Sequence, residues 1–89
     1  MQNTEKLYND NRRAIEHGIH FKVSQKDNKG ARWVNIKDDI SSIFDAIKCA
    51  QSIQCFEVAI FAMHEVGGFL YWSSKNPEEF NSSVLDKLN

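Results

Sequence analysis

Cysteine and histidine side chains are the residues of this chain that could bind a metal or act as nucleophile and base. The ligand types of a zinc site are present in Cys49, Cys55 and His64, together with His17 and His20. No Cys-x-x-Cys pair occurs, and the five residues between Cys49 and Cys55 fit no common zinc site. A glycine between His17 and His20 interrupts the helical geometry that would align them. We therefore predict no metal site and interpret both cysteines as small apolar packing groups.

A catalytic nucleophile would need a cysteine or serine within reach of a histidine and a carboxylate. The nearest combination is Cys55 with His64 and Glu65, but these lie at opposite ends of one expected strand, roughly 30 Å apart. Asp38 and Asp39 could suggest acid–base chemistry, yet adjacent aspartates at the start of a helix are typical of a cap. The Gly-Gly pair of the chain lacks the Lys and Ser/Thr of a phosphate loop. We therefore predict a protein that is not an enzyme and needs no cofactor.

The composition indicates one small domain, and we predict a single domain over residues 1–89. Apolar residues make up 42% and charged residues 26%, a balance that favours a folded chain over a disordered one. No apolar run approaches the roughly 20 residues that span a bilayer, and no secretory leader is evident. We expect a soluble cytoplasmic protein with reduced thiols. Its richness in Asn, Lys, Ser and Ile is typical of a bacterial or phage accessory protein.

The charge pattern gives little attraction to nucleic acid or to an anionic membrane. The formal net charge is −1, and only Arg12 and Arg13 are adjacent among basic residues that are otherwise scattered along the chain. We therefore expect no membrane partner and rank nucleic acid behind protein as a partner. The nucleic-acid alternative would use Trp33, Lys22 and Arg32 together with the arginine pair.

Helical periodicity indicates one helix at each end of the chain and one in the middle. Residues 4–18 are predicted to form the first, with Thr4 as N-cap and Gly18 as its C-terminal stop. Its thin stripe consists of Leu7, Asn11, Ala14 and Ile15. The last, residues 76–88, begins with Asn76 as N-cap. Its apolar stripe consists of Phe80, Val84, Leu85 and Leu88.

The middle helix has the clearest pattern of the three. It is predicted over residues 39–52, with Asp38 or Asp39 as its cap. Its stripe consists of Ile40, Ile43, Phe44, Ile47 and Ala50. A stripe of this width must pack on another surface, and the only surface large enough is a β-sheet.

Alternating apolar and polar residues predict a first β-hairpin over residues 19–36. A loop at residues 26–29 places Phe21 opposite Val34, so that apolar residues meet across the two strands. The same register sets Lys22 opposite Trp33 on the more polar face. A large aromatic residue has no core role there, and three interpretations stay open: a cation–π pair with the lysine, cover by the first helix, or an anchor at an interface.

A second hairpin is predicted over residues 55–72, with a glycine-containing turn centred on Val66 and Gly67. Both of its faces are apolar, whereas a half-solvated antiparallel sheet alternates apolar and polar residues. One face would carry four large side chains, with Phe61 opposite Trp72 and Met63 opposite Leu70.

The order α-β-β-α-β-β-α predicts an α+β two-layer sandwich with a four-stranded, mainly antiparallel sheet. A helix about 10 Å across shields only part of a sheet about 19 Å wide. Exposure of Phe61, Met63, Leu70 and Trp72 would leave on the order of 300 to 500 Å² of apolar surface. We therefore hypothesise a binding protein that forms a homodimer or docks this face on a protein partner, with Trp33 as a further contact. Cover of both faces by the chain's own helices would remove this hypothesis.

Overall fold

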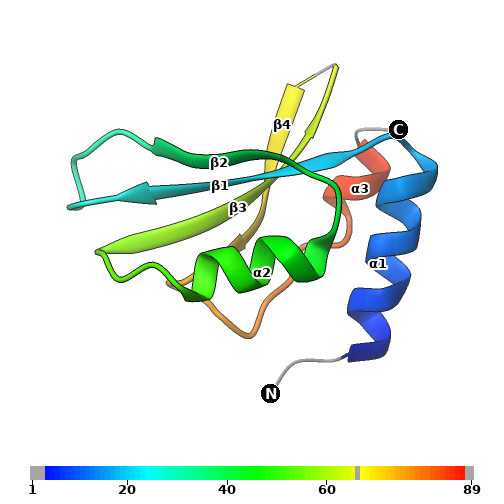
Figure 1. The fold of residues 1–89 in the computed structure, drawn as a ribbon, viewed down its shortest axis with the longest axis horizontal. Helices are drawn as coiled ribbons and strands as arrows, with labels where there is room; N and C mark the ends of the chain where they lie inside the picture. The colour runs from blue at the N-terminus through cyan, green and yellow to red at the C-terminus, as the bar shows by residue number, and fades with distance from the viewer. Residues whose placement is uncertain (1–3, 66, 88–89) are drawn as a thin grey trace.

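The computed structural model describes residues 4–65 and 67–87, which form three helices and a four-stranded sheet. The elements are α1 Thr4–Glu16, β1 His20–Lys26, β2 Val34–Ile40, α2 Ile43–Gln51, β3 Glu57–His64, β4 Gly67–Ser73 and α3 Val84–Lys87. Neighbouring strands are antiparallel and follow the order β2-β1-β3-β4 across the sheet (Figure 1). The predicted α+β fold and its element order are therefore confirmed.

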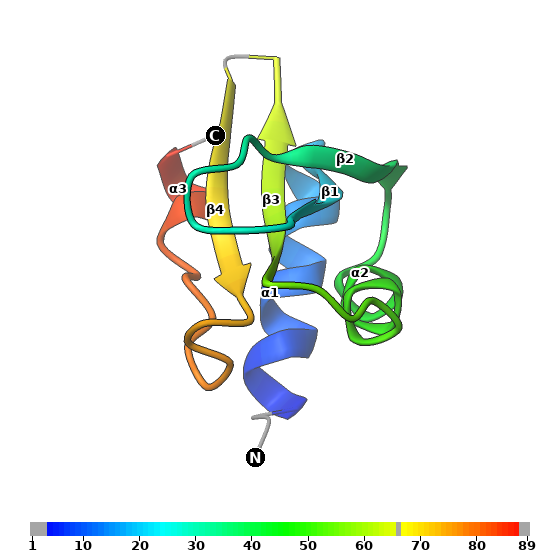
Figure 2. The same ribbon diagram turned by 90° about the vertical axis from the view of Figure 1, so that its left-hand side faces the viewer.

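The helices pack on one side of the sheet. α2 contacts β1, β2 and β3, α3 contacts β4, and α1 packs against α2 and α3 (Figures 1 and 2). The sheet contributes buried core residues from all four strands, namely Phe21, Val23, Ile40, Val58, Ile60, Ala62 and Tyr71. α1 therefore lies on the same side as the other helices and does not cover the second face. No helix among the described residues has the length and apolar character needed to cross a membrane.

α1 stops where the sequence predicts. Gly18 has a φ of 69°, a left-handed conformation that glycine adopts without strain, and the N–H of Ile19 donates to the carbonyl of Ala14 at 2.9 Å. The predicted stripe is only partly buried, because Ile15 is 62% exposed. The buried face of α1 also includes Asp10, a polar residue that the apolar pattern did not indicate.

The register of the first hairpin differs from the prediction. β1 and β2 are joined by residues 27–33, so Gln25 pairs with Val34 and Phe21 pairs with Ile40. Two irregularities in the pairing shift the register further along the strands. Val34, the predicted partner of Phe21, is 51% exposed on the edge strand. The prediction was wrong because it chose the shortest loop that matched apolar residues and assumed an unbroken ladder.

The predicted cap of the middle helix was also wrong, because Asp38 and Asp39 belong to β2. α2 follows Ser42, whose hydroxyl accepts from the N–H groups of the second and third helical residues at 3.2 and 3.5 Å. Asp39 has a φ of 59°, which aspartate tolerates better than most residues. Ile40, predicted for the helical stripe, is buried at the end of β2, where it fills the core opposite Phe21.

The predicted C-terminal helix forms only over its last residues, as α3. Asn76 begins a turn instead of capping a helix: its carbonyl accepts from the N–H of Glu79 at 3.1 Å, and its side-chain amide donates to the Glu79 carboxylate at 2.7 Å. Such side-chain bonds compete with helical hydrogen bonding. Leu88 of the predicted stripe and Val66 of the predicted second turn lie outside the described residues.

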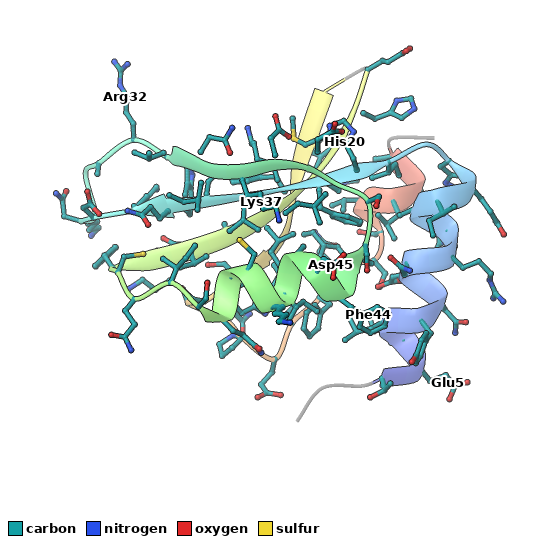
Figure 3. All side chains as sticks on the ribbon, viewed as in Figure 1. Glu5, His20, Arg32, Lys37, Phe44 and Asp45 are labelled. Atoms are coloured by element: carbon teal, nitrogen blue, oxygen red, sulfur yellow. The ribbon has the colours of Figure 1, made fainter. Side chains whose placement is uncertain are left out.

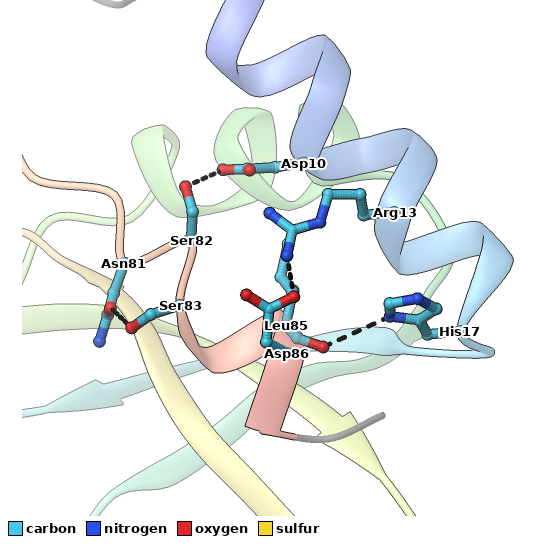
Figure 4. Close-up of polar contacts among 8 residues, drawn as sticks. All are labelled: Asp10, Arg13, His17, Asn81, Ser82, Ser83, Leu85 and Asp86. Carbon is cyan, nitrogen blue, oxygen red and sulfur yellow. Dashed lines mark hydrogen bonds and ion pairs between the residues drawn. The ribbon is translucent and has the colours of Figure 1, made fainter.

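A buried polar network ties the C-terminal segment to α1 (Figure 4). The hydroxyls of Ser82 and Tyr71 both donate to the same carboxylate oxygen of Asp10, each at 2.7 Å. Arg13 pairs with Asp86 nearby. Burial, reinforced by the hydrogen bond to Asp10 and by the charge of its carboxylate, raises the pKa of Tyr71 well above its ordinary value. Three distant parts of the chain therefore meet at one carboxylate.

Candidate functional site

The candidate site is the side of the sheet opposite the helices, which we call the open face. On the central strands β1 and β3, its residues alternate with the core residues and include Lys22, Ser24, Phe61 and Met63. The connection between β1 and β2, residues 27–33, passes in front of β3 in Figure 2, whereas α1 lies behind that strand. This connection brings Trp33 onto the open face.

The pairing of β3 with β4 decides which predicted residues share this face. Phe61 lies opposite Leu70 and Met63 lies opposite Gly68, where the prediction paired them with Trp72 and Leu70. The difference is two residues near the turn, so Phe61, Met63 and Leu70 remain on one side of the sheet. A bulge in β4 just beyond Leu70 separates Trp72 from this set.

Trp72 packs toward the C-terminal segment, where it lines a second hollow with Leu70, and is not brought together with Trp33, Phe61 and Met63. Its indole N–H donates to the carbonyl oxygen of Pro77 at 3.0 Å. Its ring stacks on that of Phe80, with centroids 6.5 Å apart and planes at 23°. These contacts give Trp72 a structural role in holding the segment after β4.

Trp33, Phe61 and Met63 line a hollow of about 330 Å³ on the open face. The rings of Trp33 and Phe61 meet edge to face, with centroids 5.4 Å apart and planes at 84°. The side chain of Met63 lies over Gly68, where an added Cβ would overlap the methionine sulfur. Leu70 borders this cluster and is 43% exposed. The remaining lining residues of the hollow are Lys22, Ser24 and Asn35.

Two lysines stand over the aromatic rings of the hollow. Lys22 Nζ lies 5.7 Å from the ring centroid of Phe61, and Lys26 Nζ lies 4.6 Å from that of Trp33. Trp33 therefore pairs with Lys26 and not, as predicted, with Lys22. Within the described part of the chain, neither lysine forms an ion pair. Glu57 lies opposite Lys26 in the sheet, but its carboxylate accepts from a serine hydroxyl of β4 at 2.6 Å.

Charge is divided unevenly between the first hairpin and the rest of the chain. The first hairpin, residues 20–40, contains five of the 11 basic residues and three of the 12 acidic residues, so it has a formal charge of +2 and the remainder −3. Figure 3 shows Arg32 projecting at the hairpin end and Glu5 at the far end of the molecule. The sequence prediction missed this division because it looked for adjacent basic residues. A count over the whole hairpin would have found it.

The residues of the nucleic-acid alternative are divided between two regions. Lys22, Trp33 and Arg32 belong to the basic hairpin, whereas Arg12 and Arg13 lie on α1, on the helix side of the sheet. Arg13 is already paired with the C-terminal segment. The five residues therefore do not form one continuous surface.

The cysteines and histidines do not form a reactive cluster. Cys49 lies on α2 and Cys55 lies just before β3, and both are half-buried free thiols that pack against the core. His17 contacts the carbonyl oxygen of Leu85 through Nδ1 at 3.4 Å. Across residues 4–65 and 67–87, no three His, Cys, Asp or Glu side chains are grouped as metal ligands would be.

Comparison with known proteins adds no assignment to these residues. No protein family, curated protein or solved structure matches the chain. The function proposed next therefore depends on the chemistry of the open face.

Proposed function

We propose that the chain is a non-enzymatic binding protein that uses the open face of its sheet to hold another protein. The observation that carries this proposal is the cluster of Trp33, Phe61, Met63 and Leu70 on the side of the sheet away from the helices. A solvated face of an antiparallel sheet normally carries polar residues. Aromatic residues and methionine are instead enriched at the centres of protein interfaces.

The size of the cluster suits the centre of an interface. Burying a further 300 Å² or so of apolar surface on such a face contributes about 7 kcal/mol. Association costs an estimated 4 to 15 kcal/mol before contacts are counted, so the cluster alone does not give tight binding. A partner must therefore add contacts at the rim of the cluster, where Lys22 and Lys26 stand.

The charge of the hairpin favours a different protein over a second copy as the partner. In a symmetric dimer formed through the open face, Lys22 and Lys26 of both copies would enter one interface, and like charges brought together there oppose association. The homodimer stays a prediction that light scattering can test. A chain that stays monomeric at high concentration and still binds a partner through its open face fits the proposal.

Site-specific photocrosslinking in the cells that carry the gene tests the proposed function. A photoreactive phenylalanine analogue replaces Leu70 on the open face or, as a control, Ile15, which is 62% exposed on α1. We expect a discrete crosslinked product from position 70 and not from position 15, and we expect Trp33→Ala to abolish it without changing the circular dichroism spectrum. Identical products from both positions, or a product indifferent to Trp33→Ala, would contradict the proposal. A product of twice the chain mass would identify a second copy.

Single-stranded nucleic acid is the second candidate, supported by the charge of +2 on residues 20–40 beside two aromatic rings. Bases stack on open ring faces, but Lys22 stands over the ring of Phe61 and Lys26 over that of Trp33. The two rings are also nearly perpendicular, which does not make a continuous stacking platform. Failure to bind a labelled oligonucleotide at low salt, where phosphate contacts are strongest, would dismiss this candidate.

A further inference from the structure

We propose that the segment of the partner that occupies the open face is acidic. An apolar side chain of that segment enters the hollow between Trp33 and Phe61, and flanking carboxylates pair with Lys22 and Lys26. This inference rests on the proposed function and goes beyond it by stating the chemistry of the partner.

The hollow suits one large apolar side chain. Its volume is about 330 Å³, and Trp33 and Phe61 form two walls that meet edge to face. Met63 forms an adaptable third wall, because a flexible thioether can change rotamer to fit a guest. Gly68 beneath it leaves the space that the methionine uses. The apolar part of the partner is therefore a single anchor rather than a broad sheet surface.

The lysines make the rim of the hollow selective for carboxylates. Lys22 and Lys26 are each half-buried over a ring and have no ion pair among the described residues. A partner that covers these ammonium groups removes water from them, which is unfavourable unless it supplies an opposite charge. A neutral or basic segment would leave two charges covered and unpaired. An acidic segment satisfies both without breaking an internal pair.

The nearby carboxylates do not satisfy these lysines. Glu57 accepts from the hydroxyl of Ser73 at 2.6 Å, and Asp27 accepts from the side-chain amide of Gln25 at 3.3 Å. At longer range, the hairpin charge of +2 against −3 on the remainder orients an acidic partner toward residues 20–40. Association should therefore weaken as salt screens this attraction.

Selection of random 12-residue peptides displayed on phage, with the intact chain as bait, tests the inference. We expect enriched peptides to combine a net negative charge with an aromatic or aliphatic residue. A synthetic copy of an enriched peptide should bind at least tenfold more weakly to a Lys22→Gln/Lys26→Gln variant. The matched control is the double variant Lys29→Gln/Lys37→Gln. It removes the same charge from the hairpin at positions away from the two rings and should change the affinity less than threefold.

The outcomes separate this inference from the proposed function. Neutral or basic peptides whose binding is lost in Trp33→Ala would overturn the acidic partner and leave the open face as the binding site. Two outcomes would count against the proposed function itself. One is that the peptides bind the Trp33→Ala variant as tightly as they bind the parent chain, and the other is that no peptide is enriched above an empty support. An oligothymidine that binds more tightly than the selected peptides, and loses binding in Trp33→Ala, would replace protein by nucleic acid as the partner.

Discussion

The hydroxyl of Tyr71 should stabilise the folded chain by about 2 kcal/mol, and Tyr71→Phe measures this contribution. Tyr71 is 1% exposed and donates at 2.7 Å to Asp10, which is 2% exposed. A hydrogen bond to a carboxylate contributes about 1.5 to 3 kcal/mol, and the Ser82 hydroxyl still satisfies the same oxygen after the change. The phenyl ring keeps its packing against Phe21 and Phe80, so no cavity adds to the effect.

Urea-induced unfolding, followed by circular dichroism, reports this loss directly as a lower midpoint with an unchanged slope. For a domain of this size, 2 kcal/mol corresponds to a lower melting temperature by about 10 °C. Tyr8→Phe is the matched control, because its side chain is on the surface at 62% exposure and its change should be within about 0.5 kcal/mol. A loss below about 0.5 kcal/mol for Tyr71→Phe would refute the buried network as a source of stability.

The same residue makes stability depend on alkaline pH. Below about pH 10, tyrosine is protonated in both the folded and the unfolded chain, so its contribution is complete. Burial raises the pKa of Tyr71 in the folded chain, so above pH 10 the unfolded chain releases a proton that the folded chain retains. The free energy of unfolding should then fall by about 1.4 kcal/mol per pH unit from this residue. Tyr71→Phe should remove that part of the slope, and an unchanged slope would show that the hydroxyl is not buried as described.

Three further changes test the boundaries of the fold and of the open face by urea unfolding. Leu70→Ser should lower the free energy of unfolding by less than about 1 kcal/mol, because the side chain is 43% exposed. Ile60→Ala in the core should lower it by about 2 to 5 kcal/mol. Similar losses for the two variants would place Leu70 in the core. Gly18→Ala should cost about 1 to 2 kcal/mol, because its φ is 69°, and a stabilising effect would mean that the helix continues. Ser42→Ala should lower the free energy of unfolding by about 1 kcal/mol, whereas no loss would show that the Ser42 hydroxyl does not cap α2.

The sequence allowed the elements to be predicted wherever one physical pattern dominated. Phe21 and Val23 of β1, together with Ile19 just before it, alternate with more polar residues and are all buried, because a side-chain period of two matches a sheet with one covered face. Ile43 and Ile47 follow the helical period and are buried in α2. These patterns depend on neighbours within one element, which is the information a single segment contains.

Boundaries were predicted poorly because they depend on contacts between distant segments. The start of α2 involves Asn11, whose side chain accepts from the N–H of Ile43 at 2.9 Å across 32 residues of sequence. The C-terminal segment leaves the helical path where the N–H of Asn81 donates to the carbonyl of Tyr71. Propensity alone favoured a longer helix there, and the tertiary hydrogen bonds to Tyr71 and Asp10 determined the outcome.

The open face could be predicted despite an incorrect register, and the reason lies in the pleat of a strand. Successive side chains point to opposite faces, so an error of two residues in pairing changes each partner and leaves each face unaltered. Phe61 and Leu70 therefore shared a face in the prediction and share it in the structure. The bulge in β4 adds an odd residue, which is why Trp72 alone leaves the set.

Trp33 reached the open face by a different route from the one that the alternation predicted. Its position on the more polar face came from a four-residue loop that does not form, and the longer connection folds back so that the indole meets Phe61. A flexible loop would not hold an indole there without favourable contacts. The edge-to-face ring pair and Lys26 supply those contacts and leave the hollow beside them unfilled by the described residues. A partner that fills the hollow and pairs the charges would offset the cost of holding there a tryptophan and two lysines that form no ion pair among the described residues.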